Sequence, residues 1–328
     1  MSVAALAMTA CTSETNEFVG APEAREIAFS PLAAPNTRAG DQYAVDGTAF
    51  PTDINMMVTA YQVSATGGSA GVYFDATSFA KGTTYWEGTT KKYWPLTPAY
   101  INFLAIANAN ADNATGVTWG SDKADEVEIV MSDNSSAQRD LMYAIGNGAV
   151  TQSGNALTFP DNVSMTFKHA QAWIDFKVKA YSATETAITI NSITLTGAKY
   201  NGTYTVTHTA YDANTGQSVA GTWSDLGSTQ NIAVPGWSAT ALTTSLVTVG
   251  KGLMIVPDDA LTGDFTSFTI NYTFDGKTYE YTYTPASTQV EQAKHYIYEI
   301  TFKLHEILIN PTVTDWADQT ATAITIQE

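Results

Sequence analysis

Cysteine is almost absent from this sequence: Cys11 is the single one among 328 residues. One thiol cannot form an internal disulfide, and we expect neither a cysteine nucleophile nor a cysteine-based metal site from this single residue. Basic residues are also scarce, with 15 Lys and Arg against 32 Asp and Glu, so the net charge is −17. Because phosphate binding needs a basic patch, this balance argues against nucleic acid and against electrostatic attachment to anionic lipid. No apolar run reaches the roughly 20 residues that a membrane-spanning helix needs.

The histidines lack the spacing of a metal or catalytic motif. They are His169, His208, His295 and His305, and no two of them form an HExxH or another short ligand spacing. No GxSxG, phosphate-binding loop or dinucleotide-binding glycine motif stands in a supporting strand–helix context either. We therefore expect no enzyme activity, no cofactor and no metal. We interpret His169 and His295 as packing or hydrogen-bonded residues within strands.

What the sequence does contain favours β-structure. Thr and Tyr are abundant, and strand-like alternation recurs from residue 54 to the end, with turn residues between the runs. The clearest case is residues 268–274 and 277–283, joined by Asp275-Gly276, a dipeptide typical of a type I′ hairpin turn. Candidate helices are few, and the best, residues 136–144, also fits loop and strand. We predict an all-β protein of antiparallel sandwiches.

Cys11 stands where an apolar segment, residues 1–10, changes to a polar one, residues 12–17. This change at the cysteine is typical of a bacterial lipoprotein processing site, after which the cysteine carries the lipid at the N-terminus of an exported protein. The alternative is a chance thiol in a disordered leader. A secretory signal begins with Lys or Arg, whereas Arg25 is the first basic residue here. We therefore expect the natural start to lie upstream of Met1.

Several short motifs follow one another along the chain. They are Ile27-Ala-Phe-Ser30, Thr37-Arg38-Ala39, Tyr93-Trp-Pro95, Ile101-Asn-Phe-Leu-Ala105, Gln138-Arg-Asp-Leu-Met-Tyr-Ala144, Phe167-Lys-His-Ala170, Ile174-Asp-Phe-Lys-Val178, Lys294-His-Tyr-Ile-Tyr-Glu-Ile300 and Val313-Thr-Asp-Trp316. In this order and spacing the chain resembles the fimbrillin family, the type V pilin lipoproteins of Gram-negative anaerobes. The resemblance implies two transthyretin-like antiparallel β-sandwich domains in tandem. It also implies that an arginine-specific protease removes the first strand and that the C-terminal strand of another subunit then fills the groove.

The first strand of this scheme corresponds to Ile27 and Phe29, which are two residues apart and so point to one face of a strand. The predicted cut lies between Arg38 and Ala39, in a loop that contains Pro and Ala and should be exposed to a protease. Arg25 is a competing site, but a cut there would leave Ile27 and Phe29 in place and open nothing. A solvated loop arginine that is never cut is the other interpretation of Arg38.

The donor strand of this scheme corresponds to the tail after Trp316. Thr322, Ile324 and Ile326 share one face of that segment, which has about the length of one strand and few charges. The alternative is an ordinary last strand that pairs within its own domain. Trp316 and Trp173 resemble core residues, so the tail begins where the fixed core ends.

The expected organisation follows from these assignments and from a turn cluster at residues 157–162. We expect a lipoprotein signal remnant at 1–11, a removable tether and first strand at 12–38, β-sandwiches at 39–163 and 164–316, and a donor strand at 317–328.

The leading hypothesis is a stalk subunit of a surface fimbria that supports adhesion. Its partners would be other pilin subunits, the protease and a host glycan or protein receptor. Its precursor would be an outer-membrane lipoprotein that the lipid on Cys11 anchors until the cut. One alternative is a surface glycan-binding lipoprotein, for which Trp86, Trp119, Trp223 and Trp237 near glycine-containing turns would have to be exposed. Another is a tip or anchor subunit of the same pilus.

Overall fold

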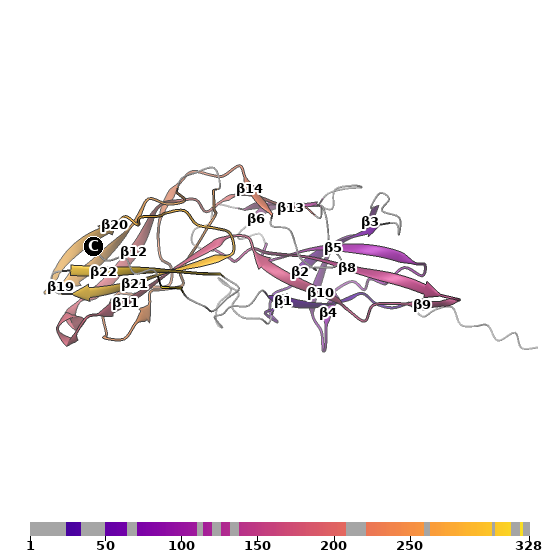
Figure 1. Ribbon diagram of the computed structural model, residues 1–328, viewed down its shortest axis with the longest axis horizontal. Coiled ribbons are helices and arrows are strands. Elements are labelled where there is room, and N and C mark those ends of the chain that lie inside the picture. Colours follow the sequence, from indigo (N-terminus) through magenta and orange to yellow (C-terminus); the bar gives the residue numbers. More distant parts are fainter. Residues whose placement is uncertain are drawn as a thin grey trace, which may run out of the picture.

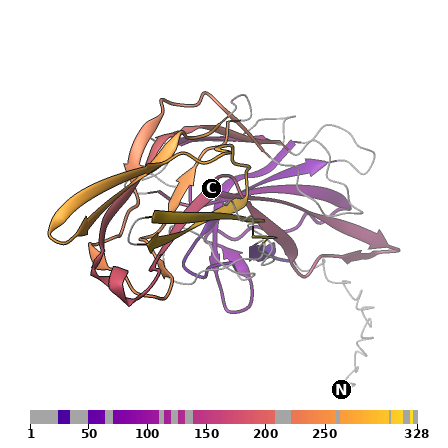
Figure 2. The ribbon, with the colours of Figure 1, turned by 60° about the vertical axis from the view of Figure 1, so that its left-hand side comes forward.

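The chain is all-β, as predicted. The computed structural model describes residues 24–33, 50–63, 71–109, 114–119, 126–131, 138–207, 221–258, 263–303, 306–315 and 322–323. These residues form strands and one 3-10 turn, η1 (Ala183–Ala187), and none of them lies in an α-helix. No helix in the described part of the chain has the length and apolarity to cross a membrane. Figures 1 and 2 show an elongated molecule with the β8–β9 and β19–β20 hairpins at opposite ends.

The N-terminal part of the molecule is one sheet that closes on itself. Its strand order is β10-β1-β4-β3-β2-β5-β8-β9, and β10 also pairs with β8 at Lys168↔Tyr143 and His169↔Met142. Seven strands therefore form a barrel-like ring, where the sequence predicted the two open sheets of a sandwich. The strands are β1 (Ala28–Ala33), β2 (Met56–Val63), β3 (Gly71–Lys81), β4 (Trp86–Gly88), β5 (Ala99–Ala107), β8 (Met142–Ser153), β9 (Ala156–Thr158) and β10 (Val163–His169).

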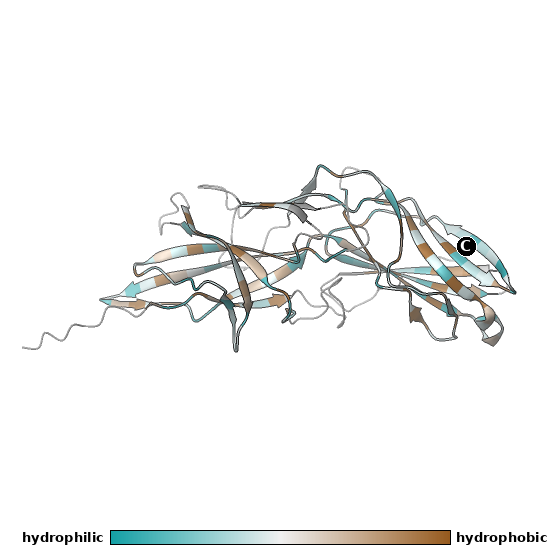
Figure 3. Ribbon diagram, turned by 180° about the vertical axis from the view of Figure 1, so that it is seen from behind, coloured by the Kyte–Doolittle hydropathy of each residue, from teal (hydrophilic) through white to brown (hydrophobic). Residues whose placement is uncertain are grey.

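The C-terminal part encloses one core between two sheets. The first has the order β17-β11-β21-β22-β23, with β18 also on β11, and the second has the order β15-β12-β19-β20, with β16 also on β12. Their inward residues, such as Phe176 and Ile300 from the first sheet and Ile193 and Phe268 from the second, form one buried cluster. Figure 3 shows hydrophobic and hydrophilic residues alternating along these strands, the period-2 pattern of a half-buried strand. The strands are β11 (Ala172–Ala180), β12 (Thr189–Ala198), β15 (Gln230–Ala233), β16 (Thr240–Ala241), β17 (Val247–Thr248), β18 (Leu253–Ile255), β19 (Ser267–Phe274), β20 (Lys277–Tyr283), β21 (Lys294–Lys303), β22 (Glu306–Asp315) and β23 (Thr322–Ala323).

A fourth sheet, of order β14-β13-β7-β6, combines segments from both halves of the sequence. The strands are β6 (Ala114–Trp119), β7 (Glu126–Met131), β13 (Gly202–Thr207) and β14 (Thr222–Ser224). β13 pairs with β7 from Gly202↔Met131 to Thr207↔Glu126. The expected division at residues 163–164 falls at the start of β10, which belongs to the N-terminal ring. Strands from the two halves of the sequence therefore pair with each other in this sheet.

The predicted hairpin is confirmed, and residues 138–144 of the candidate helix 136–144 form loop and strand, the alternative that the sequence left open. Asp275 and Gly276 have φ of 49° and 71°, the positive values that a type I′ turn requires at both central residues. Residues 138–141 are not helical, and β8 begins at Met142. The backbone of Leu141 is engaged elsewhere, since its N–H donates to Gln171 Oε1 at 3.2 Å and its carbonyl accepts from the Ala170 N–H at 2.9 Å. Tertiary contacts thus override the local helix propensity.

Candidate functional site

The first strand, β1, is an internal member of the N-terminal ring. It runs parallel to β10, with pairs from Phe29↔Val163 to Ala33↔Phe167, and antiparallel to β4, with Ala28↔Glu87 and Phe29↔Trp86. In the strand order β1 is the link between β10 and β4. We call the space that β1 occupies between these two strands the β1 slot. Removing β1 would open the ring and expose the facing edges of β10 and β4.

The residues ahead of β1 extend this pairing. The Ile27 N–H donates to Lys92 O at 2.7 Å, and the Trp94 N–H donates to Arg25 O at 2.8 Å. Lys91 Nζ lies 2.6 Å from Glu26 Oε2, and this hydrogen bond raises the pKa of the Lys91 amine. The Arg25 guanidinium forms an ion pair with Asp161. Residues 25–27 are therefore held by backbone hydrogen bonds to residues 92 and 94 and by the ion pairs of Arg25 and Glu26.

The side chains of Ile27 and Phe29 fill the core of the ring, and both have 0% exposure. The Phe29 ring meets Phe79 edge-on at 4.7 Å and Phe103 edge-on at 5.1 Å, measured between centroids. Leu32, which points the other way, is 50% exposed. The strand thus inserts one apolar face between the core aromatic residues and leaves the other face toward solvent.

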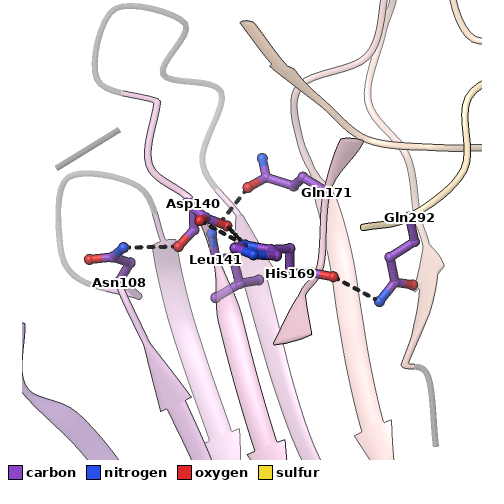
Figure 4. A network of polar contacts seen from close by, with 6 residues as sticks. All are labelled: Asn108, Asp140, Leu141, His169, Gln171 and Gln292. Carbon is purple, nitrogen blue, oxygen red and sulfur yellow. Dashed lines mark hydrogen bonds and ion pairs between the residues drawn. The ribbon is translucent and has the colours of Figure 1, made fainter. Parts of the chain in front are cut away.

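A buried polar network lies at the far end of β10 (Figure 4). His169 Nδ1 is 2.9 Å and 2.8 Å from the two carboxylate oxygens of Asp140, and the two side chains are 1% and 0% exposed. The Asn108 amide donates to Asp140 O at 3.0 Å, and the Gln292 amide donates to His169 O at 3.2 Å. The network joins the ends of β5, β8 and β10 to the turn before β21.

The sequence does not reveal that these two residues form a pair. It indicates His169 as a hydrogen-bonded strand residue and places Asp140 in a candidate helix. They are 29 residues apart, and no local pattern links two positions at that distance. The sequence offers one indication that Asp140 and His169 matter: they lie in two of the motifs on which the family resemblance rests, residues 138–144 and 167–170.

The second Asp–His pair lies in the C-terminal part. The His295 ring stacks on Trp173 with centroids 3.9 Å apart and planes 5° apart, and His295 Nε2 is 3.0 Å from Asp175 Oδ2. Stacking and hydrogen bonding match the interpretation of His295 as a packing residue. Among the described residues, no group of three or more His, Cys, Asp and Glu side chains could hold a metal ion.

The tryptophans that a sugar-binding surface would need point largely inward. Trp86 does not have the exposure that the glycan-binding alternative requires: it is 7% exposed, because β4 lies between β1 and β3 and its indole packs edge-on against Phe50 at 5.7 Å. Trp119, Trp223 and Trp237 are half-buried. The indole N–H groups of Trp223 and Trp237 donate to the backbone carbonyls of Ala170, at 2.7 Å, and Ile190, at 3.0 Å.

The described part of the tail pairs with its own chain. β23 runs antiparallel to β22, with Thr312↔Ala323 and Val313↔Thr322, the arrangement of a last strand within its own domain. The other candidate residues lie outside the described residues: Cys11, Arg38, Ala39, Trp316, Ile324 and Ile326.

Comparison with known proteins shows where this architecture recurs. A family model described as fimbrillin-like matches residues 37–316, and comparison with curated protein sequences found no match. A solved structure of a candidate cell adhesion protein from Bacteroides ovatus aligns with a TM-score of 0.54 and 14% identity, over 90% of this chain and 99% of the other. A second candidate cell adhesion protein, from Bacteroides uniformis, aligns with a TM-score of 0.51 and 15% identity, over 89% of this chain and 99% of the other. A fimbrial protein from Bacteroides vulgatus aligns with a TM-score of 0.47 and 16% identity, over 88% of this chain and 99% of the other.

Proposed function

Because this chain belongs to the fimbrillin-like family, we propose that it is a structural subunit of the pilus stalk that polymerises when its first strand is replaced by the tail of another subunit. The observation that carries this proposal is the position of β1. It is bonded on both sides within a closed ring, and Ile27 and Phe29 are fully buried. A terminal segment with these contacts leaves a deep, strand-shaped opening when it is removed. Filling a sheet edge with an extended segment is a general mode of strand addition.

Cleavage after Arg38 is the cut that would free this strand. Arg38 follows β1, whereas Arg25 precedes it, so cutting after Arg25 leaves β1 attached. Arg25 is also engaged, since its carbonyl accepts from the Trp94 N–H and its side chain pairs with Asp161. A protease needs an extended, unpaired segment. We propose that an arginine-specific protease of the surface makes this cut and that the lipid on Cys11 departs with residues 11–38.

The tail is our proposed donor, with Thr322, Ile324 and Ile326 facing into the β1 slot of the next subunit. It would first have to leave β22, where Thr322 and Ala323 now pair. Burying two Ile side chains gives roughly 3–6 kcal/mol, and ordering the tail opposes this by about 1–2 kcal/mol per residue. Further contacts between subunits and a high unfolding barrier would therefore stabilise the fibre.

The two-domain interpretation is part of the same proposal. The C-terminal core between two sheets is the arrangement that a transthyretin-like sandwich requires, and the N-terminal ring would correspond to a sandwich whose sheets join through β10 and β8. A dedicated glycan site is not proposed, because the inward-directed tryptophans do not favour it.

The test is to trim the purified precursor with trypsin and to look for a ladder of polymers by electrophoresis without boiling. The Arg38→Ala precursor should stay monomeric, whereas the matched Arg25→Ala precursor should still polymerise. A trimmed protein that stays monomeric, or a chain without residues 317–328 that still polymerises, would refute the proposal.

A further inference from the structure

β10 is the strand most affected by loss of β1. One of its edges pairs with β1 at five successive positions, Phe29↔Val163 to Ala33↔Phe167. Its other pairing, to β8, covers the two residues at its C-terminal end, Lys168 and His169. Once β1 has left, the residues 163–167 have lost their neighbour along the whole of one edge. The strand that must receive a donor is thus held mainly at one end.

That end is where the buried network lies. The Asp140 carboxylate contacts His169 Nδ1 through both oxygens, and the Ala170 N–H donates to Leu141 O at 2.9 Å. These bonds connect His169 at the end of β10, and Ala170 after it, to the segment that leads into β8. Neither bond involves β1, so removing the first strand does not break them.

The middle of β10 also depends on close packing against β8. A Cβ at Gly146 of β8 would overlap Met165 Sδ and would lie 3.1 Å from Val163 Cγ1 and 3.2 Å from Ser164 O. β10 therefore approaches β8 as closely as a glycine allows. This packing places β10 beside β8 but gives it no backbone bonds along residues 163–167.

We propose that Asp140 and His169 are positioning residues of the β1 slot, which anchor β10 to β8 while the slot is empty. A donor strand then meets an edge that is already in place. Without the anchor, β10 would have to be ordered at the moment of exchange, and that entropy would oppose binding. This inference rests on the proposed function, because it concerns the state between loss of β1 and arrival of the donor.

The test compares the same chain before and after β1 leaves. A recognition sequence for a site-specific protease is placed within residues 34–49, and Phe29→Ala lets the freed strand dissociate. Ile324→Asp and Ile326→Asp keep the chain's own tail from filling the slot. Amide hydrogen exchange is then measured across residues 163–170, with and without Asp140→Asn. The matched control is Asp175→Asn, which removes the carboxylate of the other Asp–His pair, in the C-terminal part.

After the cut, Asp140→Asn should raise exchange across residues 163–170 by about tenfold or more relative to the unsubstituted cut chain. Before the cut it should change this exchange by less than about twofold, because β1 still holds β10. The control substitution, Asp175→Asn, should leave exchange across residues 163–170 unchanged both before and after the cut. Equal exchange with and without Asp140→Asn after the cut, or an equal rise before and after it, would overturn the inference.

A second readout remains decisive if Asp140→Asn does not fold. In the unsubstituted cut chain, the Ala170 amide should exchange about tenfold more slowly than the amides of residues 163–165. Uniform loss of protection from 163 to 170 would show that no anchor exists.

A synthetic peptide of residues 317–328 separates this inference from the proposed function. It should bind the cut chain and should bind the Asp140→Asn cut chain about tenfold more weakly. A peptide that binds neither chain refutes the tail as donor, while the exchange data still decide the anchor.

Discussion

At the scale of single residues, Phe29 and His169 lie at the two ends of the proposed exchange site. Phe29 fills the core of the ring from a strand that we propose to be removable, and His169 fixes the strand beside it. The burial of Ile27 and Phe29 follows from their spacing, since residues two apart share a strand face. The Asp140–His169 contact did not follow from the sequence, because its partners are joined by topology and not by a local pattern.

Truncation of Phe29 should reveal how much the uncut chain depends on β1. Phe29→Ala is expected to lower the free energy of unfolding by about 3–5 kcal/mol, because it leaves a cavity between Phe79 and Phe103. Leu32→Ala, on the exposed face of the same strand, should change it by less than about 0.5 kcal/mol. Denaturant unfolding of both variants measures this, and equal losses would contradict the packing described for β1.

The stability of the uncut chain should fall as pH rises above about 10. Burial raises the pKa of the Tyr296 hydroxyl to about 12 from its usual value of 10.0. The unfolded chain therefore loses this proton first, so stability is complete below pH 10 and declines between pH 10 and about 12. Tyr296→Phe should make this decline shallower, as followed by unfolding at several pH values. An unchanged slope would show that Tyr296 is not the group responsible.

At the scale of elements, patterns with a local cause were predictable. The Asp275-Gly276 turn and the strands beside it follow from turn chemistry and from alternation. Residues 136–144 fitted both a helix and a loop with a strand, and the local pattern could not decide between them, because the Leu141 backbone bonds to Gln171 and Ala170, residues that are distant in sequence. The closure of the ring also could not be predicted, because it depends on two residue pairs between β10 and β8.

Gly146 tests that closure directly. Gly146→Ala would place a methyl group against Met165 and the backbone of Ser164, and overpacking of this kind costs about 1–3 kcal/mol. A methyl group at Gly116 of β6 would have no atom within 4 Å, so Gly116→Ala should change stability by less than about 0.5 kcal/mol. Thermal and denaturant unfolding compare the two, and equal effects would contradict close contact between β10 and β8.

At the scale of the whole molecule, the resemblance to fimbrillins is confirmed by the family match over residues 37–316. The sequence predicted this from the order of its motifs. It could not predict that β13 pairs with β7, which joins the two halves through a sheet of their own.

The most direct test of the central claim is cross-linking between subunits after the cut. The trimmed chain would have no cysteine of its own, because Cys11 leaves with residues 1–38. One population carries Ser164→Cys, at the solvent-facing position of β10 that pairs with Ser30 of β1. The other carries Ala323→Cys or Thr325→Cys, on the tail face opposite Ile324. In the control experiment, a chain with Thr278→Cys, on the exposed face of β20, takes the place of the Ser164→Cys chain.

The account predicts disulfide-linked pairs between the Ser164→Cys chain and one of the two tail variants, after trimming and not before. Two results would contradict the claim that the tail of one subunit replaces β1 in the next. One is a polymer that forms with neither tail variant cross-linked to Ser164→Cys. The other is a cross-link that appears equally with Thr278→Cys or without trimming.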